Sequence, residues 1–166
     1  YFQGAINSPW AMSTHADAYP PPNYFDISVQ DQCSALTYAF RHRLTDNPTG
    51  QATRLYEASI RHYVEGLRRA GSPYAFHTIG SAQAINLLSY AAVRGYPKRS
   101  GGEDFYLLNK LAKVGSITEI KSAVIEIDAR ISSRVPFGTG PAVTRLLDSP
   151  DMFVEPIFYN PKIFAQ

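Results

Sequence analysis

An acidic pair preceded by two glycines has the clearest chemical potential in this sequence. Residues 100–104 read SGGED, so Glu103 and Asp104 directly follow the glycines. Paired carboxylates supply general acid or base catalysis, and glycines ahead of them let a ligand approach the backbone closely. The structural alternative is a capping box, in which Ser100 caps a helix and Glu103 hydrogen-bonds back to the first turn. The residue types leave both interpretations open.

Two further clusters have side chains suited to a ligand. His15 and Asp17 lie two residues apart in the segment 13–18 (STHADA), and on an extended backbone they point the same way, toward one cation. Arg130 and Arg134 precede the segment 135–140 (VPFGTG). Guanidinium groups bind phosphate in a bidentate manner, and glycines expose backbone N–H groups, which predicts a phosphate-binding loop. The alternatives are a solvated pair near a terminus and a surface turn with solvated arginines.

The histidines carry less information. His77 lies in the apolar segment 74–79, which favours a hydrogen-bonded core histidine over a catalytic one. His42 and His62 lie in exposed-looking contexts and receive no role.

The elements that must position these residues alternate between strands and helices. Apolar residues at a spacing of three and four predict a helix over 53–70, and shorter patterns predict helices over 82–93 and 104–114. Strands are expected over 35–43, 74–79, 117–120 and 123–131. This alternation favours a mixed α/β layer structure.

The chain is expected to hold one domain between two end segments. Residues 1–4 (YFQG) resemble the remnant of a cleavable tag, so 1–12 are treated as a tag or cloning remnant. The folded part is expected over 13–148. Three prolines break the apolar stretches beyond it, which predicts an extended C-terminal tail over 149–166.

Composition excludes several classes of protein. The 166 residues carry 16 Lys and Arg against 14 Asp and Glu, a net charge of +2, which gives no electrostatic case for nucleic-acid binding. Cys33 is the single cysteine, so an internal disulfide and a cysteine metal cluster are excluded. No apolar run approaches the roughly 18 residues that span a bilayer. We therefore expect a soluble, cytoplasmic protein, with membrane association of a longer parent left open.

In their order, these motifs resemble the second half of the catalytic domain of family two glycosyltransferases with the GT-A fold. The resemblance covers about residues 13–142. It is nearest to bacterial members in which a VPFGTG segment follows the Glu-Asp helix. It rests on STHADA at 13–18, PNYF at 22–25, HTIGS at 77–81, GYP at 95–97, and GGEDFYLL at 101–108.

The resemblance implies an inverting enzyme that transfers a sugar from a nucleotide-diphosphate sugar to a hydroxyl acceptor. Asp104 matches the general base, and Glu103 would orient the site. Asp17 matches the second acid of the Asp-Xaa-Asp motif, which with His15 would hold Mg²⁺ or Mn²⁺ against the diphosphate. The donor and acceptor would be bound by Gly80, Ser81, Gly101, Gly102, Arg130 and Arg134.

Two departures from the family pattern open other interpretations. His15 stands where the first Asp is expected, and the nucleotide-binding strands of the family's first half have no counterpart in this chain. The resemblance therefore implies a partial GT-A fold, a three-layer mixed sheet with flanking helices whose exposed sheet edge favours homo-oligomers. The main alternative is a non-catalytic, truncated folding module that self-associates. A hydrolytic pair of His77 and Asp104 is a weaker one, because no nucleophile elbow accompanies it.

Overall fold

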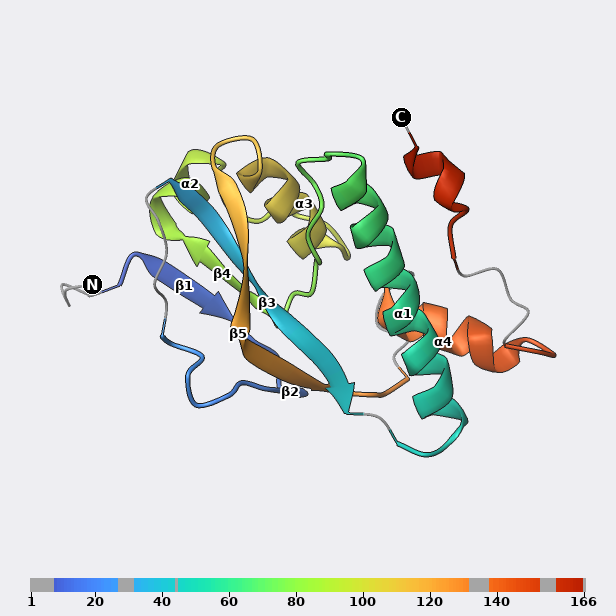
Figure 1. The fold of residues 1–166 in the computed structure, drawn as a ribbon. Coiled ribbons are helices and arrows are strands. Elements are labelled where there is room, and N and C mark those ends of the chain that lie inside the picture. Colours follow the sequence, from blue (N-terminus) through green and yellow to red (C-terminus); the bar gives the residue numbers. More distant parts are fainter. Residues whose placement is uncertain (1–7, 27–31, 44, 132–137, 153–157, 166) are drawn as a thin grey trace.

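Five strands form one mixed sheet with helices around it (Figure 1). The computed structural model describes residues 8–26, 32–43, 45–131, 138–152 and 158–165. The strand order is β1-β4-β3-β5-β2; β3 and β5 run parallel, and all other neighbours are antiparallel. The mixed α/β class predicted from the sequence is therefore confirmed. The strands are β1 (Trp10–Ser13), β2 (Ala18–Tyr19), β3 (Cys33–Arg43), β4 (Gln83–Asn86) and β5 (Ser116–Asp128).

Four α-helices and one 3₁₀ helix are formed by the described residues. The longest, α1, starts where Asn47 accepts a hydrogen bond of 2.9 Å from the Gly50 N–H and where Pro48 occupies the first turn. It ends with Arg68 and Arg69, whose charges suit the negative end of the helix dipole. The helices are α1 (Pro48–Arg69), α2 (Leu87–Ala92), α3 (Glu103–Leu111), α4 (Thr139–Asp148) and the 3₁₀ helix η1 (Pro161–Phe164).

The central strand β3 is buried on both faces. Ala35 packs with Leu107, Leu108 and Leu111 of α3 on one face. The alternate residues Leu36, Tyr38 and Phe40 lie on the other face of β3. They form a second cluster with Ile125 and Ile127 of β5. Each fully buried aliphatic side chain contributes about 1.5–3 kcal/mol, so β3 and α3 form a firm base for the loops at their ends.

Helix α4 packs on α1 rather than on the sheet. Val143 and Leu146 of α4 are buried against Ala52 of α1, and this cluster is separate from the two clusters of the sheet. In Figure 1, α4 crosses α1 beside the ends of β3 and β5. The sequence reasoning missed this helix.

Several predicted elements differ from the structure. Residues 74–79 form turns and bends instead of a strand, and the segment predicted as one helix over 82–93 is β4 followed by α2. β4 pairs with both β1 and β3, so tertiary pairing overrides the local helical pattern. The two strands expected over 117–120 and 123–131 are one bulged strand, β5.

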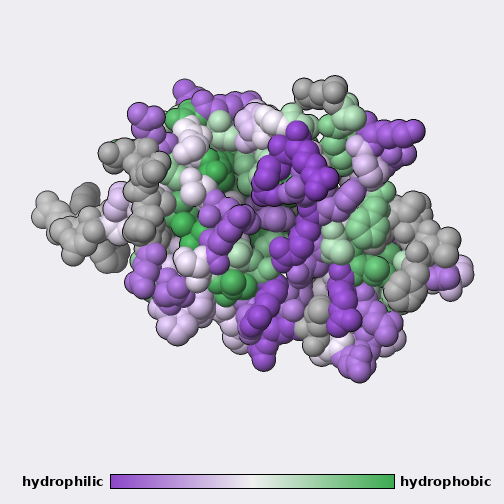
Figure 2. Space-filling view, in the orientation of Figure 1, coloured by the Kyte–Doolittle hydropathy of each residue, from purple (hydrophilic) through white to green (hydrophobic). Residues whose placement is uncertain are grey.

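The two ends of the described chain contact the fold. β1 begins at Trp10, so three residues from the segment set aside as a remnant pair with β4. In the segment predicted as an extended tail, η1 places Phe164 over Gly66 of α1. Figure 2 shows hydrophilic residues over much of the face seen in Figure 1, with smaller hydrophobic patches between them. Among the described helices, none is both long and apolar enough to cross a membrane.

Candidate functional site

A cavity of about 540 Å³ opens where the ends of several elements meet. Its walls come from the β1–β2 turn, the loop before β4, the first turns of α3 and α4, and the end of β5. Segments far apart in the sequence therefore meet at one place. Of the residues proposed from the sequence as site residues, those that line this cavity are His15, Asp17, Gly80, Ser81, Gly102, Glu103, Asp104 and Arg130.

Two proposed residues do not line it. Gly101 is buried and lies two residues before the start of α3. Arg134 lies outside the described residues, as do residues 135–137 of the segment 135–140 that follows it.

Asp17 is held in an ion pair with Arg130. Asp17 immediately precedes β2, and its Oδ2 atom accepts a hydrogen bond of 2.6 Å from Arg130 Nε. Burial opposes ionisation of this carboxyl, but the hydrogen bond and the charge of Arg130 outweigh it and lower the pKa of Asp17. Asp17 is thus a carboxylate whose charge Arg130 already neutralises in part.

Asp104 is in a different electrostatic environment. Burial, together with the neighbouring charge of Glu103, raises the pKa of Asp104, although its Oδ1 accepts a hydrogen bond of 2.7 Å from the Phe105 N–H. The side chain of Glu103 is exposed. Of these two neighbouring acids, Asp104 is therefore the one in the more enclosed position.

Gly80 brings Asp104 and His15 close to one another. A Cβ added at Gly80 would lie 3.1 Å from Asp104 Oδ2 and 3.4 Å from His15 Nε2. Both side chains therefore approach the Gly80 backbone within contact distance, and a larger residue there would press on both. This close approach is the structural reason for a glycine at position 80.

The SGGED segment does not form a capping box. Gly102 is the N-cap of α3, with φ of 70° and ψ of 19°, and no side chain caps the helix. Only glycine adopts this left-handed conformation without strain. Of the two interpretations of residues 100–104, the capping box is wrong, and the glycine shapes a cavity wall instead.

The first turn of α4 also faces the cavity. Gly138, Thr139 and Gly140 line it, and no acidic residue lies in this turn. Tyr56 of α1 lines the cavity as well; burial raises the pKa of its phenol, and the neighbouring Thr139 partly offsets this rise. The free backbone N–H groups of such a turn, with the positive end of the helix dipole, favour a bound anion.

His42 is a cavity residue that the sequence reasoning missed. Its side chain is only 3% exposed, and its Nδ1 lies 2.7 Å from Glu57 Oε2. The same oxygen accepts the His42 backbone N–H, while Arg61 donates to the other oxygen. Despite burial, these partners lower the pKa of Glu57 to about 2. The feature that could have identified His42 is its position on the buried face of β3. That face can be assigned only when the pairing of β3 with its neighbouring strands is known.

His77 is buried, as the core interpretation predicted. Its Nδ1 lies 3.6 Å from Glu119 Oε1. Whereas Asp104 lines the 540 Å³ cavity, His77 lines a neighbouring pocket, which gives no support to a hydrolytic pair of the two.

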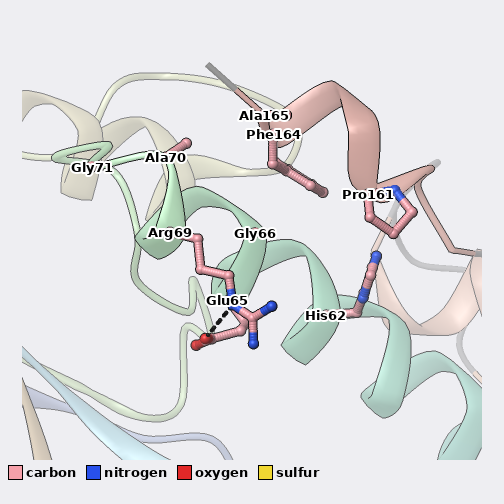
Figure 3. A pocket seen from close by; sticks show the side chains of 9 residues that line it. All are labelled: His62, Glu65, Gly66, Arg69, Ala70, Gly71, Pro161, Phe164 and Ala165. Carbon is pink, nitrogen blue, oxygen red and sulfur yellow. Dashed lines mark hydrogen bonds and ion pairs between the residues drawn. The ribbon is translucent and has the colours of Figure 1, made fainter.

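A wider hollow of about 650 Å³ lies on another part of the surface, between α1 and η1 (Figure 3). Glu65 and Arg69 form an ion pair at its edge, and Phe164 covers Gly66. None of the residues proposed from the sequence lines it.

The donor set does not make a metal site on its own. The described residues include no group of three or more His, Cys, Asp or Glu side chains placed to hold a metal ion. Asp17 is already engaged by Arg130, and His15 adds no negative charge at its position. The side chains thus do not fit a resident Mg²⁺ or Mn²⁺.

Comparisons of this chain with protein-family models, with curated proteins and with solved structures found no match.

Proposed function

We propose that the 540 Å³ cavity is the acceptor and diphosphate side of an inverting glycosyltransferase site, in a partial GT-A fold. The observation that carries the proposal is convergence: eight of the residues that the resemblance singles out come from four separate segments and line one cavity. Such convergence of acids, an arginine and glycine-led helix starts is what a site for a phosphorylated sugar donor requires.

Asp104 is the general base in this proposal. The acceptor hydroxyl gives its proton to the Asp104 carboxylate while its oxygen forms a bond to the anomeric carbon. The bond from that carbon to the phosphate oxygen breaks, and the nucleoside diphosphate leaves with the electron pair. A raised pKa strengthens Asp104 as a proton acceptor, because basicity follows the pKa of the conjugate acid.

Arg130 and the first turn of α4 stabilise the leaving diphosphate. The Nε of Arg130 binds Asp17, and no other residue that the structure describes bonds its guanidinium, so its terminal nitrogens can bind a second anion. The α4 turn adds backbone N–H donors without an opposing acid. Both groups act where negative charge grows during bond breaking.

Calorimetric titration of the chain with UDP and with GDP tests this proposal. We expect binding in EDTA, and weakening by about tenfold in Arg130→Gln because a charge-assisted contact is lost. Arg69→Gln is the matched control, since Arg69 is an exposed arginine paired with Glu65 at the α1–η1 hollow. Absence of binding, or equal weakening by both substitutions, would contradict the proposal.

The Asp17→Asn substitution distinguishes binding of the diphosphate by Arg130 from binding through a metal ion. If Arg130 carries the diphosphate, the Asp17→Asn variant binds UDP in EDTA as well as the unchanged chain or better, because Arg130 loses its competing carboxylate. If Mn²⁺ carries it, binding needs the metal and the substitution abolishes it. The second result would restore the metal role implied by the resemblance.

The second candidate function is that of a non-catalytic folding module that self-associates. The observation in its favour is the sheet edge: β1 is an outermost strand, and its outer side pairs with no other strand among the residues that the structure describes. An open edge of this kind pairs readily with a second chain.

A further inference from the structure

His42 is a buried histidine of the cavity that the proposed mechanism does not use. It lies near the end of β3 and lines the 540 Å³ cavity, as does Ile127, its register partner on β5. Ile127 also pairs with Ala18 of β2, so these three residues form one row across the sheet, about 10 Å long. Asp17 directly precedes Ala18, and its partner Arg130 lies three residues after Ile127. The sugar of a nucleotide-diphosphate sugar held at Arg130 can therefore reach His42.

Glu57 fixes the orientation and the tautomer of the His42 ring. Its Oε2 lies 2.7 Å from His42 Nδ1 and accepts the His42 backbone N–H at 2.9 Å. Because the pKa of Glu57 is about 2, this oxygen is ionised at neutral pH and can only accept, so Nδ1 carries the proton. Arg61 donates to the other oxygen of Glu57 and to the Phe40 carbonyl, which holds the carboxylate in place. In the neutral ring, Nε2 is therefore a hydrogen-bond acceptor.

The Nε2 atom of His42 is open to the cavity. No residue that the structure describes is hydrogen-bonded to it. Among the described side chains, the nitrogen and oxygen atoms that are both fully buried and unpartnered are Thr37 Oγ1, His77 Nε2 and Gln83 Oε1. His42 Nε2 is not one of them, so it keeps accessible surface although the side chain as a whole is only 3% exposed. A ligand in the cavity that His42 lines can therefore bond to Nε2.

The chemistry of this atom favours a hydroxyl group over a phosphate. A neutral ring that is protonated on Nδ1 has no proton at Nε2 to offer a phosphate oxygen, whereas it accepts one from a hydroxyl. The Glu57 carboxylate behind the ring also strengthens Nε2 as an acceptor. The groups of the cavity that suit an anion are Arg130 and the first turn of α4.

We propose that His42 recognises the donor sugar, with its Nε2 accepting a hydrogen bond from a hydroxyl of the hexose while the diphosphate lies at Arg130 and α4. The inference rests on the proposed function and adds a residue for sugar recognition to the same site. Glu57 is a positioning residue in this arrangement, because it acts only through the ring of His42.

Calorimetric titration of the chain at pH 8 tests the inference with ligands that differ by the hexose: UDP beside UDP-glucose and UDP-galactose, and GDP beside GDP-mannose. In His42→Asn, an amide N–H near the position of Nδ1 can still donate to Glu57, but the acceptor at Nε2 is lost. We expect at least one nucleotide sugar to bind about fivefold more weakly, because one hydrogen bond is lost, while UDP and GDP bind as before. His62→Asn is the matched control, since His62 lies at the α1–η1 hollow.

The His42→Gln substitution distinguishes sugar recognition from a role in stability. Its longer side chain places an amide oxygen near the position of Nε2 but loses the donor to Glu57. If Nε2 binds the sugar, His42→Gln keeps more affinity for the nucleotide sugar than His42→Asn, whereas Tm is lower in His42→Gln than in His42→Asn. Affinity that instead follows Tm would show a structural role and overturn the inference.

Nitrogen NMR of the histidine rings is a second measurement, made on the unchanged chain and therefore independent of how the variants fold. We expect the proton of His42 on Nδ1, and the Nε2 signal should move on adding the nucleotide sugar but not on adding UDP or GDP. A proton on Nε2, or equal effects of His42→Asn on a nucleotide sugar and on its nucleoside diphosphate, would overturn the inference. UDP or GDP binding that persists in those cases leaves the proposed function standing, whereas the absence of all nucleotide binding contradicts both.

Discussion

Burial destabilises the charged form of Asp104, which is the form that the proposed mechanism needs. Burial is the main cause of its raised pKa. A group whose pKa is higher in the folded chain than in the unfolded one stabilises the fold below the unfolded pKa. That contribution is lost as the pH rises through the folded pKa. The proposed base is therefore a site where stability is sacrificed for function.

The Asp104→Asn substitution tests this conflict. An amide keeps an oxygen for the Phe105 N–H but carries no charge, so we expect Tm to rise by about 2–4 °C at pH 7. Near pH 3 the unchanged side chain is itself neutral, and the difference should vanish. Thermal unfolding at both pH values measures it. A loss of stability at pH 7 would show that the carboxylate is not strained.

The pKa of Glu57 is shifted in the opposite direction to that of Asp104. Its pKa of about 2 lies below the ordinary value of 4.5, so its contribution to stability is complete above pH 4.5 and disappears as the pH falls toward 2. The Glu57→Gln substitution breaks charged hydrogen bonds with His42 and Arg61, and we expect a loss of about 1.5–3 kcal/mol at pH 7.

Urea unfolding at pH 7 and at pH 3 measures this difference. The loss of stability should be smaller at pH 3. At that pH the unfolded chain binds a proton at Glu57 that the folded chain still excludes, so the ionised carboxylate stabilises the fold less. A loss that is the same at both pH values would place the effect in packing rather than in charge. Glu65→Gln is a control on the exposed side of the same helix.

Helices and strands with a clear local sequence pattern were predicted. Those whose structure depends on pairing with distant strands were not. The stripe of α1, the acids that open α3 and the run of β3 are visible in the sequence and are present in the structure. β4 is four residues long, and Gln83 within it is 1% exposed, so only its two partner strands identify it. The sequence of α4 opens with Gly138, Gly140 and Pro141, which suggest a turn, yet proline fits the first turn of a helix.

The candidate site follows the same pattern. Asp17 was a candidate because it lies two residues from His15, Asp104 because two glycines precede the acidic pair, and Arg130 because it leads into a glycine-bracketed segment. His42 was not, because its burial and its bond to Glu57 come from the pairing of β3 and the packing of α1. The ion pair between Asp17 and Arg130 also joins residues that only the sheet brings together.

The contact between α1 and η1 depends on Gly66. A Cβ there would lie 2.5 Å from ring atoms of Phe164, so Gly66→Ala should displace η1. The same change favours the helix by up to about 1 kcal/mol. We expect faster proteolysis after residue 158 with no loss of global stability. Phe164→Ala should release η1 equally without the gain in helix stability. An unchanged cleavage rate in both variants would contradict this role for the contact.

For the whole molecule, the open side of β1 predicts self-association. Light scattering with size exclusion should show a mass that rises with concentration, and Ala11→Lys should lower it because charges on an edge strand oppose pairing. Ala91→Lys in α2 is the matched control at an exposed alanine. A monomer at all concentrations would contradict the prediction.

The central claim is that one cavity binds the diphosphate of a sugar donor, and amide NMR of the isotope-labelled chain with UDP or GDP tests it most directly. The account predicts saturable shifts at Gly80, Gly102, Thr139 and Gly140, whose backbones line the cavity, and none at Gly66 and Gly71 in the α1–η1 hollow. Shifts confined to the hollow, or no shifts at millimolar nucleotide, would contradict it.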